Sequence, residues 1–227
     1  MRALRYKNML KCVANDSKKS NYLFFWSRGS ANVKCFSNFW GMNLSVTWPA
    51  NEGIPEFLWG QTRTYPSAEH AYMALRALDN SSACEFEMGG LFASFEIFRK
   101  WPQGKSGSKD MMASKQKAWR DCPGIIAKMV SRLEPRVIWK TWGVNWKPAS
   151  HKGPLRGVWT PIFDAKYTRD NALGKALIAT MPLELVEYDR APKKTSFWGA
   201  KLVDGRLVGA NTMGELLQER RKRLIEA

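Results

Sequence analysis

The chain has 227 residues, of which 44% are hydrophobic and 25% are charged, and its formal net charge is +16. This balance is typical of a folded globular protein and excludes a disordered one. No run approaches the ~18 consecutive apolar residues of a membrane span. The first residues, Met1 to Lys7, are followed by no apolar segment, so we expect no secretory signal, no membrane partner and a cytoplasmic location.

The cysteines indicate the same compartment. Cys12, Cys35, Cys84 and Cys122 are far apart and form no C-x-x-C motif, and the chain has only two histidines. Spacing typical of a zinc site is therefore absent. We expect free thiols in a reducing compartment, with no metal and no cofactor.

The positive charge is concentrated in two segments. Residues 1–20 hold six Lys or Arg against one Asp, and residues 99–156 hold 14 against three acids. Such clustering favours a polyanionic partner, most often nucleic acid, although a solubilising surface would have the same composition. We interpret residues 1–20 as a basic N-terminal extension and residues 21–227 as one folded domain.

In chain order, β-prone runs predict short strands at 22–26, 35–40 and 44–48. Helices are expected from Ser67 onward and in the following later segments: 84–101, 109–120, 123–130 and 157–180. A strand at 183–188, a hairpin turn at 203–206 and a final helix over 213–225, capped by Asn211, complete the pattern. The predicted fold class is α+β, a helix-dominated single domain with a small antiparallel β component.

The stretch from Tyr65 to Ala74 has the clearest helix start. Pro66 and Ser67 suit the position before a first turn, and Glu69 then lies where the helix dipole favours a carboxylate. A fixed anion beside aromatic rings and His70 could stabilise a cationic transition state, or Glu69 could simply favour the helix terminus. The residues expected to face the core are Ala71, Ala74, Leu75 and Leu78.

Lys128 is a single lysine among the apolar residues Ile126, Met129 and Val130. Its stem could lie along the surface with the ammonium in water. If it points into a pocket instead, desolvation would lower its pKa and make it a usable nucleophile or acid.

Aromatic and basic residues alternate from Glu134 to Leu155. The residues are Trp139, Trp142 and Trp146 with Lys140, Lys147 and Lys152. This alternation suits stacking on bases and pairing with phosphates, whereas Trp139 and Trp142 could equally be core residues of one helix.

Five short motifs, taken in order, resemble the NADAR family of YbiA-like N-glycosidases, from about Tyr22 to Arg223. They are Ser37-Asn38-Phe39-Trp40, the run Tyr65-Pro66-Ser67-Ala68-Glu69-His70-Ala71-Tyr72, Ala127-Lys128, Phe197-Trp198-Gly199, and Asn211-Thr212-Met213-Gly214. The resemblance implies a helix-dominated fold with a small β component and hydrolysis of N-glycosidic bonds, with ADP-ribose as ligand or product. Some members of the family remove ADP-ribose from guanine in nucleic acid and are partners of DarT-type toxins, and others act on early riboflavin-pathway intermediates.

The resemblance also implies site residues. Glu69 would stabilise an oxocarbenium-like state or orient water, and Trp198 would stack on a ring of the ligand. Lys128 would protonate the leaving base or form a Schiff base with the opened ribose. Implied ligand contacts are Ser37, Asn38, Phe39, Trp40, Tyr65, His70, Asn211 and Gly214, and we add Arg28 as a candidate for pyrophosphate because guanidinium binds phosphate oxygens in pairs.

Two positions depart from the family pattern. Thr195 stands where an Asp often precedes Trp-Gly, with Asp189 nearby across a longer loop. Arg76 stands where the family often has Lys, which keeps a cation but not a nucleophile.

The leading hypothesis is removal of ADP-ribose from ADP-ribosylated guanine in DNA or RNA, as an antitoxin or counter-defence activity. One alternative is the same chemistry on free nucleotides or riboflavin intermediates, which should respond little to salt. The other is a catalytically inactive module that binds nucleic acid or ADP-ribose.

Overall fold

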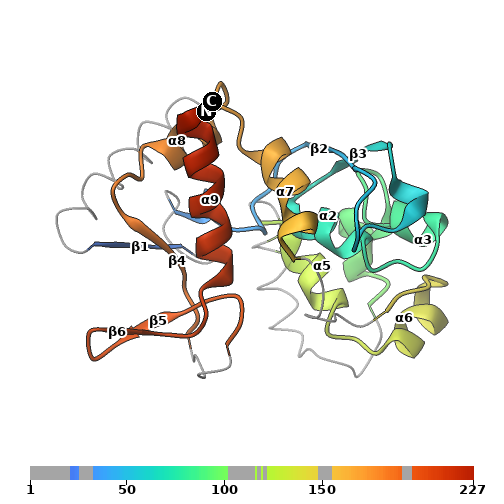
Figure 1. Ribbon diagram of the computed structural model, residues 1–227. Helices are drawn as coiled ribbons and strands as arrows, with labels where there is room; N and C mark the ends of the chain where they lie inside the picture. The colour runs from blue at the N-terminus through green and yellow to red at the C-terminus, as the bar shows by residue number, and fades with distance from the viewer. Residues whose placement is uncertain are drawn as a thin grey trace. The chain divides into compact units, whose positions relative to one another are not determined.

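A computed structural model describes residues 21–25, 33–101, 116, 119, 122–147, 155–190 and 196–227. The chain forms two compact units (Figure 1). Unit 1 comprises Met1–Ser37 with Lys166–Ala227, and unit 2 comprises Asn38–Ala165. The predicted extension over residues 1–20 lies outside the described residues.

Unit 1 is built on β1 (Tyr22–Phe25), which pairs in parallel with β4 (Glu184–Glu187). The C-terminal helix α9 (Thr212–Glu226) packs along β4 and against α8 (Ala172–Ile178). A hairpin joins β5 (Lys201–Val203) to β6 (Arg206–Val208). Its turn residues Asp204 and Gly205 both have positive φ, 48° and 77°, as a tight two-residue hairpin requires. The predicted turn and final helix are therefore confirmed.

The strand predicted at 35–40 is wrong, because the chain forms the 3₁₀ turn η1 (Lys34–Phe36) followed by a loop. Two backbone carbonyls of this stretch accept hydrogen bonds from side chains instead of from a neighbouring strand. The Lys166 ammonium donates to the Ser37 carbonyl at 2.8 Å, and the Tyr167 hydroxyl donates to the Phe36 carbonyl at 3.3 Å.

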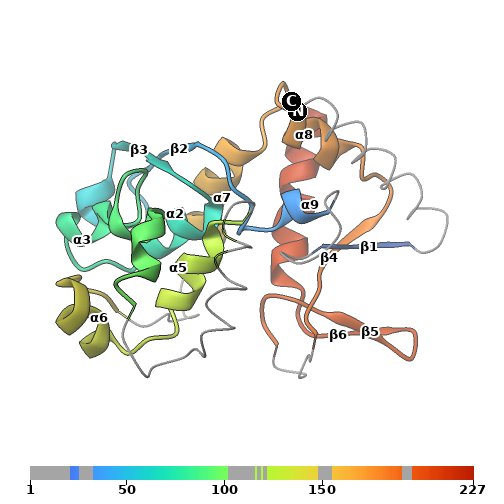
Figure 2. The same ribbon diagram turned by 180° about the vertical axis from the view of Figure 1, so that it is seen from behind.

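Unit 2 contains the antiparallel pair β2 (Leu44–Thr47) and β3 (Thr62–Tyr65), with Leu44 opposite Tyr65. The helices of this unit are α2 (Ala68–Ala74), α3 (Asn80–Cys84), α5 (Gly124–Val130), α6 (Pro135–Trp142) and most of α7 (Leu155–Lys166). Short 3₁₀ turns are η2 (Glu56–Leu58), η3 (Leu91–Ala93) and η4 (Phe95–Phe98). Helices α2 and α5 lie side by side in both views (Figures 1 and 2).

Two helix predictions in unit 2 need correction. The stretch 84–101 holds 3₁₀ turns instead of a long helix, because Gly89 adopts a φ of 93° and the chain turns back at Gly90. Leu78 is 59% exposed because α2 ends at Ala74, before Leu78 could share its buried face. Of the helix predicted over 109–120, only Gln116 and Trp119 are described, and both are helical.

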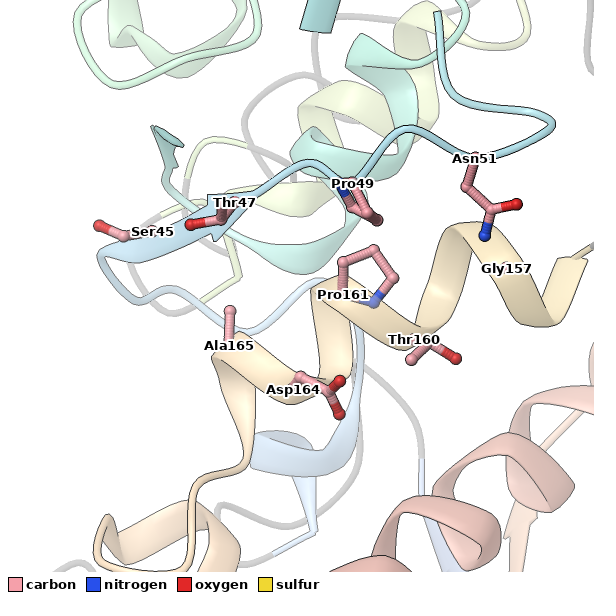
Figure 3. Close-up of a pocket in the computed structure, with 9 residues that line it drawn as sticks. All are labelled: Ser45, Thr47, Pro49, Asn51, Gly157, Thr160, Pro161, Asp164 and Ala165. Atoms are coloured by element: carbon pink, nitrogen blue, oxygen red, sulfur yellow. The ribbon is translucent and has the colours of Figure 1, made fainter. Parts of the chain in front are cut away.

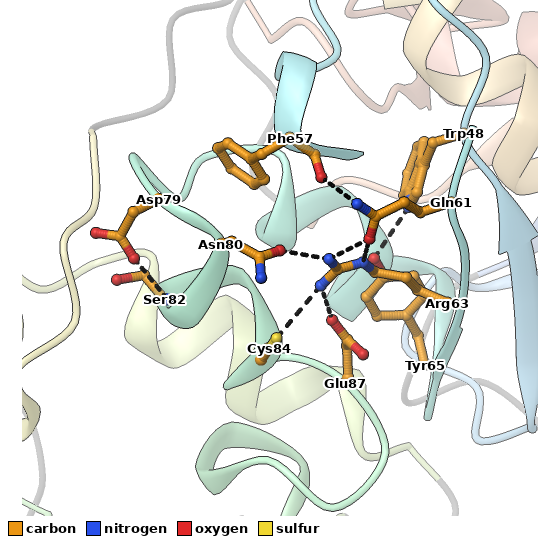
Figure 4. A network of polar contacts seen from close by, with 10 residues as sticks. All are labelled: Trp48, Phe57, Gln61, Arg63, Tyr65, Asp79, Asn80, Ser82, Cys84 and Glu87. Carbon is orange, nitrogen blue, oxygen red and sulfur yellow. Dashed lines mark hydrogen bonds and ion pairs between the residues drawn. The ribbon is translucent and has the colours of Figure 1, made fainter. Parts of the chain in front are cut away.

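Arg63 ties the strand that leads to α2 onto α3 (Figure 4). Its guanidinium pairs with the Glu87 carboxylate and donates to Asn80 and Gln61, and it lies 3.3 Å from the Cys84 sulfur. A buried guanidinium is tolerated only when its charge and N–H groups are matched in this way. The network therefore holds β3 in place, and β3 leads directly into α2.

The predicted fold class is confirmed. The described part of the chain is α+β, with helices predominating and small sheets of two strands each. Two of the described sheets are antiparallel as expected, and the β1–β4 pair is parallel. In the described part of the chain, no helix combines the length and apolar character needed to span a bilayer.

Candidate active site around Glu69

Glu69 lies in the first turn of α2, which begins where the sequence predicts. Ser67 occupies the N-cap position, and its hydroxyl accepts a hydrogen bond from the His70 amide at 3.3 Å. The Glu69 amide donates to the Asn38 carbonyl at 3.0 Å, which ties α2 to the loop that follows η1. The Glu69 carboxylate is therefore carried on backbone that is fixed from two sides.

Helix α5 begins against the same point. The Gly124 amide donates to the Phe39 carbonyl at 3.2 Å. A Cβ at Gly124 would lie 2.6 Å from the Phe39 Cα, 2.7 Å from the Ser67 hydroxyl and 3.1 Å from the Glu69 Cβ. Only glycine permits this approach, so the starts of α2 and α5 and the 38–39 loop converge on Glu69.

Lys128 reaches Glu69 from one turn further along α5. Its ammonium lies 3.9 Å from Glu69 Oε1, and the two side chains are 38% and 6% exposed. That oxygen accepts no hydrogen bond from any described residue. Lys128 therefore points to the buried carboxylate, and its side chain is also open to solvent.

Burial dominates the electrostatics of this carboxylate. Desolvation raises the pKa of Glu69, and the positive charges of Lys128, Arg76 and Arg132 partly oppose that rise. A carboxylate whose pKa is raised in this way can take up or release a proton closer to neutral pH than an exposed one. A buried anion with an unbonded oxygen is also suited to stabilising a nearby developing cation.

An aromatic stack adjoins the carboxylate. Tyr72, one helical turn after Glu69, stacks on Trp159 of α7 with ring centroids 4.8 Å apart and planes at 21°. Burial and the Glu69 charge both raise the pKa of Tyr72, so the phenol stays protonated and uncharged. Trp159 is absent from the sequence-based site because no local pattern links it to Glu69.

Arg76 keeps its charge near Glu69 while its side chain is bonded elsewhere. Its guanidinium lies 3.6 Å over the ring of Trp146, and Nε and Nη2 donate to the Lys147 carbonyl at 3.1 and 3.0 Å. Burial lowers its pKa to about 10, so it is a cation at neutral pH. The position where the family often has Lys is thus a structural cation in this chain.

His70 and Tyr65 are buried in hydrogen-bonded positions. The Ser67 hydroxyl lies 2.8 Å from His70 Nδ1, and the Phe92 carbonyl lies 3.0 Å from Nε2, which assigns the proton to Nε2. Burial lowers the pKa of His70 to about 4, so the ring is neutral. The Tyr65 hydroxyl accepts a hydrogen bond from the Trp48 indole at 3.0 Å. The described contacts of both residues are those of core side chains.

The 38–40 loop and its neighbours divide between the units. Asn38 is buried, Phe39 and Trp40 are half-buried, and all three belong to unit 2. Asn38 and Phe39 lie near Glu69, through their backbone bonds to the starts of α2 and α5. Ser37 belongs to unit 1, where its carbonyl binds Lys166. Arg28 lies outside the described residues.

Trp198, Asn211 and Gly214 also belong to unit 1. Trp198 is half-buried, contacts Phe197 edge to face, and accepts a backbone hydrogen bond from Met213 at 3.0 Å. Asn211 is in the N-cap position of α9, but its side chain does not cap the helix. Its amide bridges β4, donating to the Leu185 carbonyl at 2.9 Å and accepting from the Glu187 amide at 3.1 Å.

Gly214 allows α9 to approach β4 closely, since a Cβ there would lie 2.1 Å from the Leu185 carbonyl oxygen. The Asp189 amide donates to the Ala200 carbonyl at 3.1 Å, next to the parallel bridge that joins Tyr188 to Ala200. Asn211 and Gly214, from the last of the five motifs, therefore both have a packing role against β4 in unit 1.

A separate pocket of about 540 Å³ lies between β2 and α7 (Figure 3). Polar and apolar residues both line it: Ser45, Thr47, Pro49, Asn51, Gly157, Thr160, Pro161, Asp164 and Ala165. Ser45 and Thr47 already bond to Thr64 and Thr62, at 3.0 and 2.8 Å. None of the residues predicted to form the site lines this pocket. Within the described ranges, no three His, Cys, Asp or Glu side chains are grouped as a metal site requires.

Comparison with known proteins gives one structural likeness. The chain is similar to the NMR structure of the E. coli protein YbiA, with a TM-score of 0.45 and 21% identity over 90% of this chain and 85% of that one. No family model and no curated protein matches the sequence.

Proposed function

We propose that this chain is an N-glycosidase that hydrolyses the bond between a ribose and a base, with Glu69 as the central catalytic group. The observation that carries the proposal is the buried Glu69 carboxylate with its unbonded Oε1 facing the half-exposed Lys128 ammonium at 3.9 Å. The motifs shared with the NADAR family support the same chemistry. Loss of a base from ribose passes through an oxocarbenium-like state, which an adjacent carboxylate stabilises.

In this proposal the C1′–N bond breaks as water attacks C1′. Glu69 faces the developing positive charge and accepts a proton from the water, and the departing base must gain a proton. The Lys128 ammonium, held beside the carboxylate and open to solvent, is placed to donate that proton. The alternative role, a Schiff base with the opened ribose, needs the neutral amine and predicts a covalent adduct that borohydride traps.

The substrate we propose is ADP-ribosylated guanine in DNA or RNA, with ADP-ribose as the product and no metal or cofactor. The net charge of +16 and its concentration in residues 1–20 and 99–156 favour a polyanion over a small metabolite. Such an activity would reverse the modification made by a DarT-type toxin.

The test is incubation of the protein with guanine-ADP-ribosylated single-stranded DNA, followed by measurement of released ADP-ribose. We expect release by the wild type and a loss of about 10²–10⁴-fold in Glu69→Gln, the range typical of a general acid or base. The matched control is Glu56→Gln, which removes an exposed carboxylate of the same unit and should change nothing.

Two other outcomes would redirect the proposal. No release from DNA, but turnover of a free N-glycoside that barely responds to salt, would favour a nucleotide or riboflavin intermediate as the substrate. Equal behaviour of the wild type and Glu69→Gln in every assay would favour a binding module without catalysis.

A further inference from the structure

Helix α6 has two faces of different character. Ile138 is fully buried, and Trp142 on the same face contacts Phe92 and Trp101 with ring centroids 5.4 and 5.7 Å apart. The opposite face carries Arg136, Trp139 and Lys140, all exposed, with Trp139 at 53%. Residues i, i+3 and i+4 share one side of a helix, so these three side chains form a single surface.

The three tryptophans of this region therefore separate into two roles. Trp146 is buried beneath the Arg76 guanidinium, and Trp142 is half-buried against aromatic rings. Trp139 alone of the three is left largely open to solvent, between two cations. The exposed half of this indole offers a flat face on which a base can stack.

The segment that runs from Lys128 through α6 carries a series of cations. Between residues 128 and 147 the cations are Lys128, Arg132, Arg136, Lys140 and Lys147, and Glu134 is the only acid. Lys128 and Arg132 both act on the pKa of Glu69, so the nearer end of the series lies within electrostatic reach of that carboxylate. Helix α6 itself lies at the periphery of unit 2 in both views (Figures 1 and 2).

We propose that the Arg136–Trp139–Lys140 face of α6 binds the single-stranded nucleic acid that carries the scissile base. Trp139 stacks on an unpaired base, and Arg136 and Lys140 contact the phosphates on either side. An acidic protein would match the charge but would not need an exposed indole between the cations. This inference rests on the proposed function for the identity of the strand, but the binding can be measured without catalysis.

The experiment measures fluorescence anisotropy of a labelled, unmodified single-stranded oligonucleotide against the full-length protein over a salt series. We expect Trp139→Ala to weaken binding about tenfold or more, because stacking on a base contributes substantially to single-strand affinity. Arg136→Gln with Lys140→Gln should reduce the slope of log K against log salt by about 1.4, since each phosphate contact contributes about 0.7 for single strands.

Matched controls separate this surface from general effects. Trp59→Ala removes another exposed indole of unit 2, 41% exposed, and Lys175→Gln removes an exposed cation of α8. Both should bind like the wild type, and thermal melting should show all variants folded. Equal binding by the wild type and the α6 variants would overturn the inference, as would displacement of the oligonucleotide by polyglutamate as effectively as by unlabelled DNA.

The same variants distinguish this inference from the proposed function. If the α6 variants lose binding, but neither they nor the wild type release ADP-ribose, the binding surface stands and the glycosidase proposal fails. If Trp139→Ala releases ADP-ribose from modified DNA with the wild-type kcat/KM, the glycosidase proposal stands and this surface is not the binding site.

Discussion

Lys128 holds its ammonium 3.9 Å from Oε1 of Glu69, close enough for strong attraction but beyond hydrogen-bonding distance. The two groups come from helices that meet only because Gly124 has no side chain. The attraction opposes the effect of burial on the Glu69 pKa. Lys128 therefore has an electrostatic role that can be measured separately from proton donation.

Removing the Lys128 charge should move the pH dependence of the reaction. In Lys128→Met the cation that lowers the Glu69 pKa is lost, so that pKa should rise further above the ordinary glutamate value. We expect the acidic limb of the kcat/KM profile to move to higher pH, because the carboxylate must be ionised in the free enzyme. Lys128→Arg keeps the charge and should keep the position of the limb. An unmoved limb in Lys128→Met would show that Glu69 does not control that titration.

The buried Glu69 carboxylate should also cost the protein stability. Its pKa is raised on folding, so between the unfolded glutamate value, about pH 4.3, and the folded pKa the folded state binds more protons than the unfolded state. By linkage, the free energy of unfolding then falls as pH rises through the window between the unfolded and folded pKa values. Glu69→Gln, which cannot ionise, should be more stable than the wild type at pH 8.

Urea melts at several pH values would check this prediction. The stability gain of Glu69→Gln should shrink as pH falls toward the unfolded glutamate pKa. A gain that is the same at every pH would assign the effect to packing instead of to charge. Glu56→Gln, at an exposed position, should show no such dependence.

Gly124→Ala should disturb the site through the backbone. The new Cβ would come within 2.6 Å of the Phe39 Cα, which cannot move independently of the loop. Overpacking of this kind costs about 1–3 kcal/mol. We expect that loss in urea melts together with reduced kcat/KM, because Glu69 must shift with the loop.

Gly157→Ala in α7 is the comparison, since its Cβ would meet only the mobile end of Asn51, at 3.0 Å. There the higher helix propensity of alanine, about 1 kcal/mol, should offset the contact. Equal stability losses at the two positions would contradict the argument from close approach.

The sequence predicts the elements of this chain where the signal is local. The N-cap at Ser67, the hairpin turn at Asp204 and Gly205, and the final helix are all set by neighbouring residues. The strand predicted at 35–40 is wrong, and the partners of its carbonyls lie far away in the sequence. Lys166 and Tyr167, more than 120 residues later, bond two of these carbonyls, and the amides that begin α2 and α5 bond two others. No window of the sequence contains that information.

The candidate site divides in the same way. Glu69 and Lys128 are found from their motifs, and the structure brings them together. The stacking of Tyr72 on Trp159 joins residues from α2 and α7, so it appears only in three dimensions. His70 is adjacent to Glu69 in sequence, yet its ring is bonded to Ser67 and Phe92, because successive residues of a helix point in directions about 100° apart.

Asn211 offers a direct comparison between a packing role and a ligand contact. Its side-chain amide uses both its donor and its acceptor on the backbone of β4, from a left-handed backbone conformation with φ of 52°. In Asn211→Asp the acceptor remains, but a carboxylate oxygen replaces the donor that faces the Leu185 carbonyl. We expect a loss of about 1–3 kcal/mol in the free energy of unfolding, as for a buried acceptor left unsatisfied.

Asn211→Gly should also be destabilised, because glycine tolerates the same φ but makes neither side-chain hydrogen bond. This variant therefore tests the side-chain bonds separately from the backbone conformation. If the residue serves packing, both variants should keep the wild-type KM at temperatures where they are folded. A raised KM with unchanged stability would instead assign Asn211 to ligand binding, as the family resemblance implies, and would mean that its bonds to β4 rearrange when ligand binds.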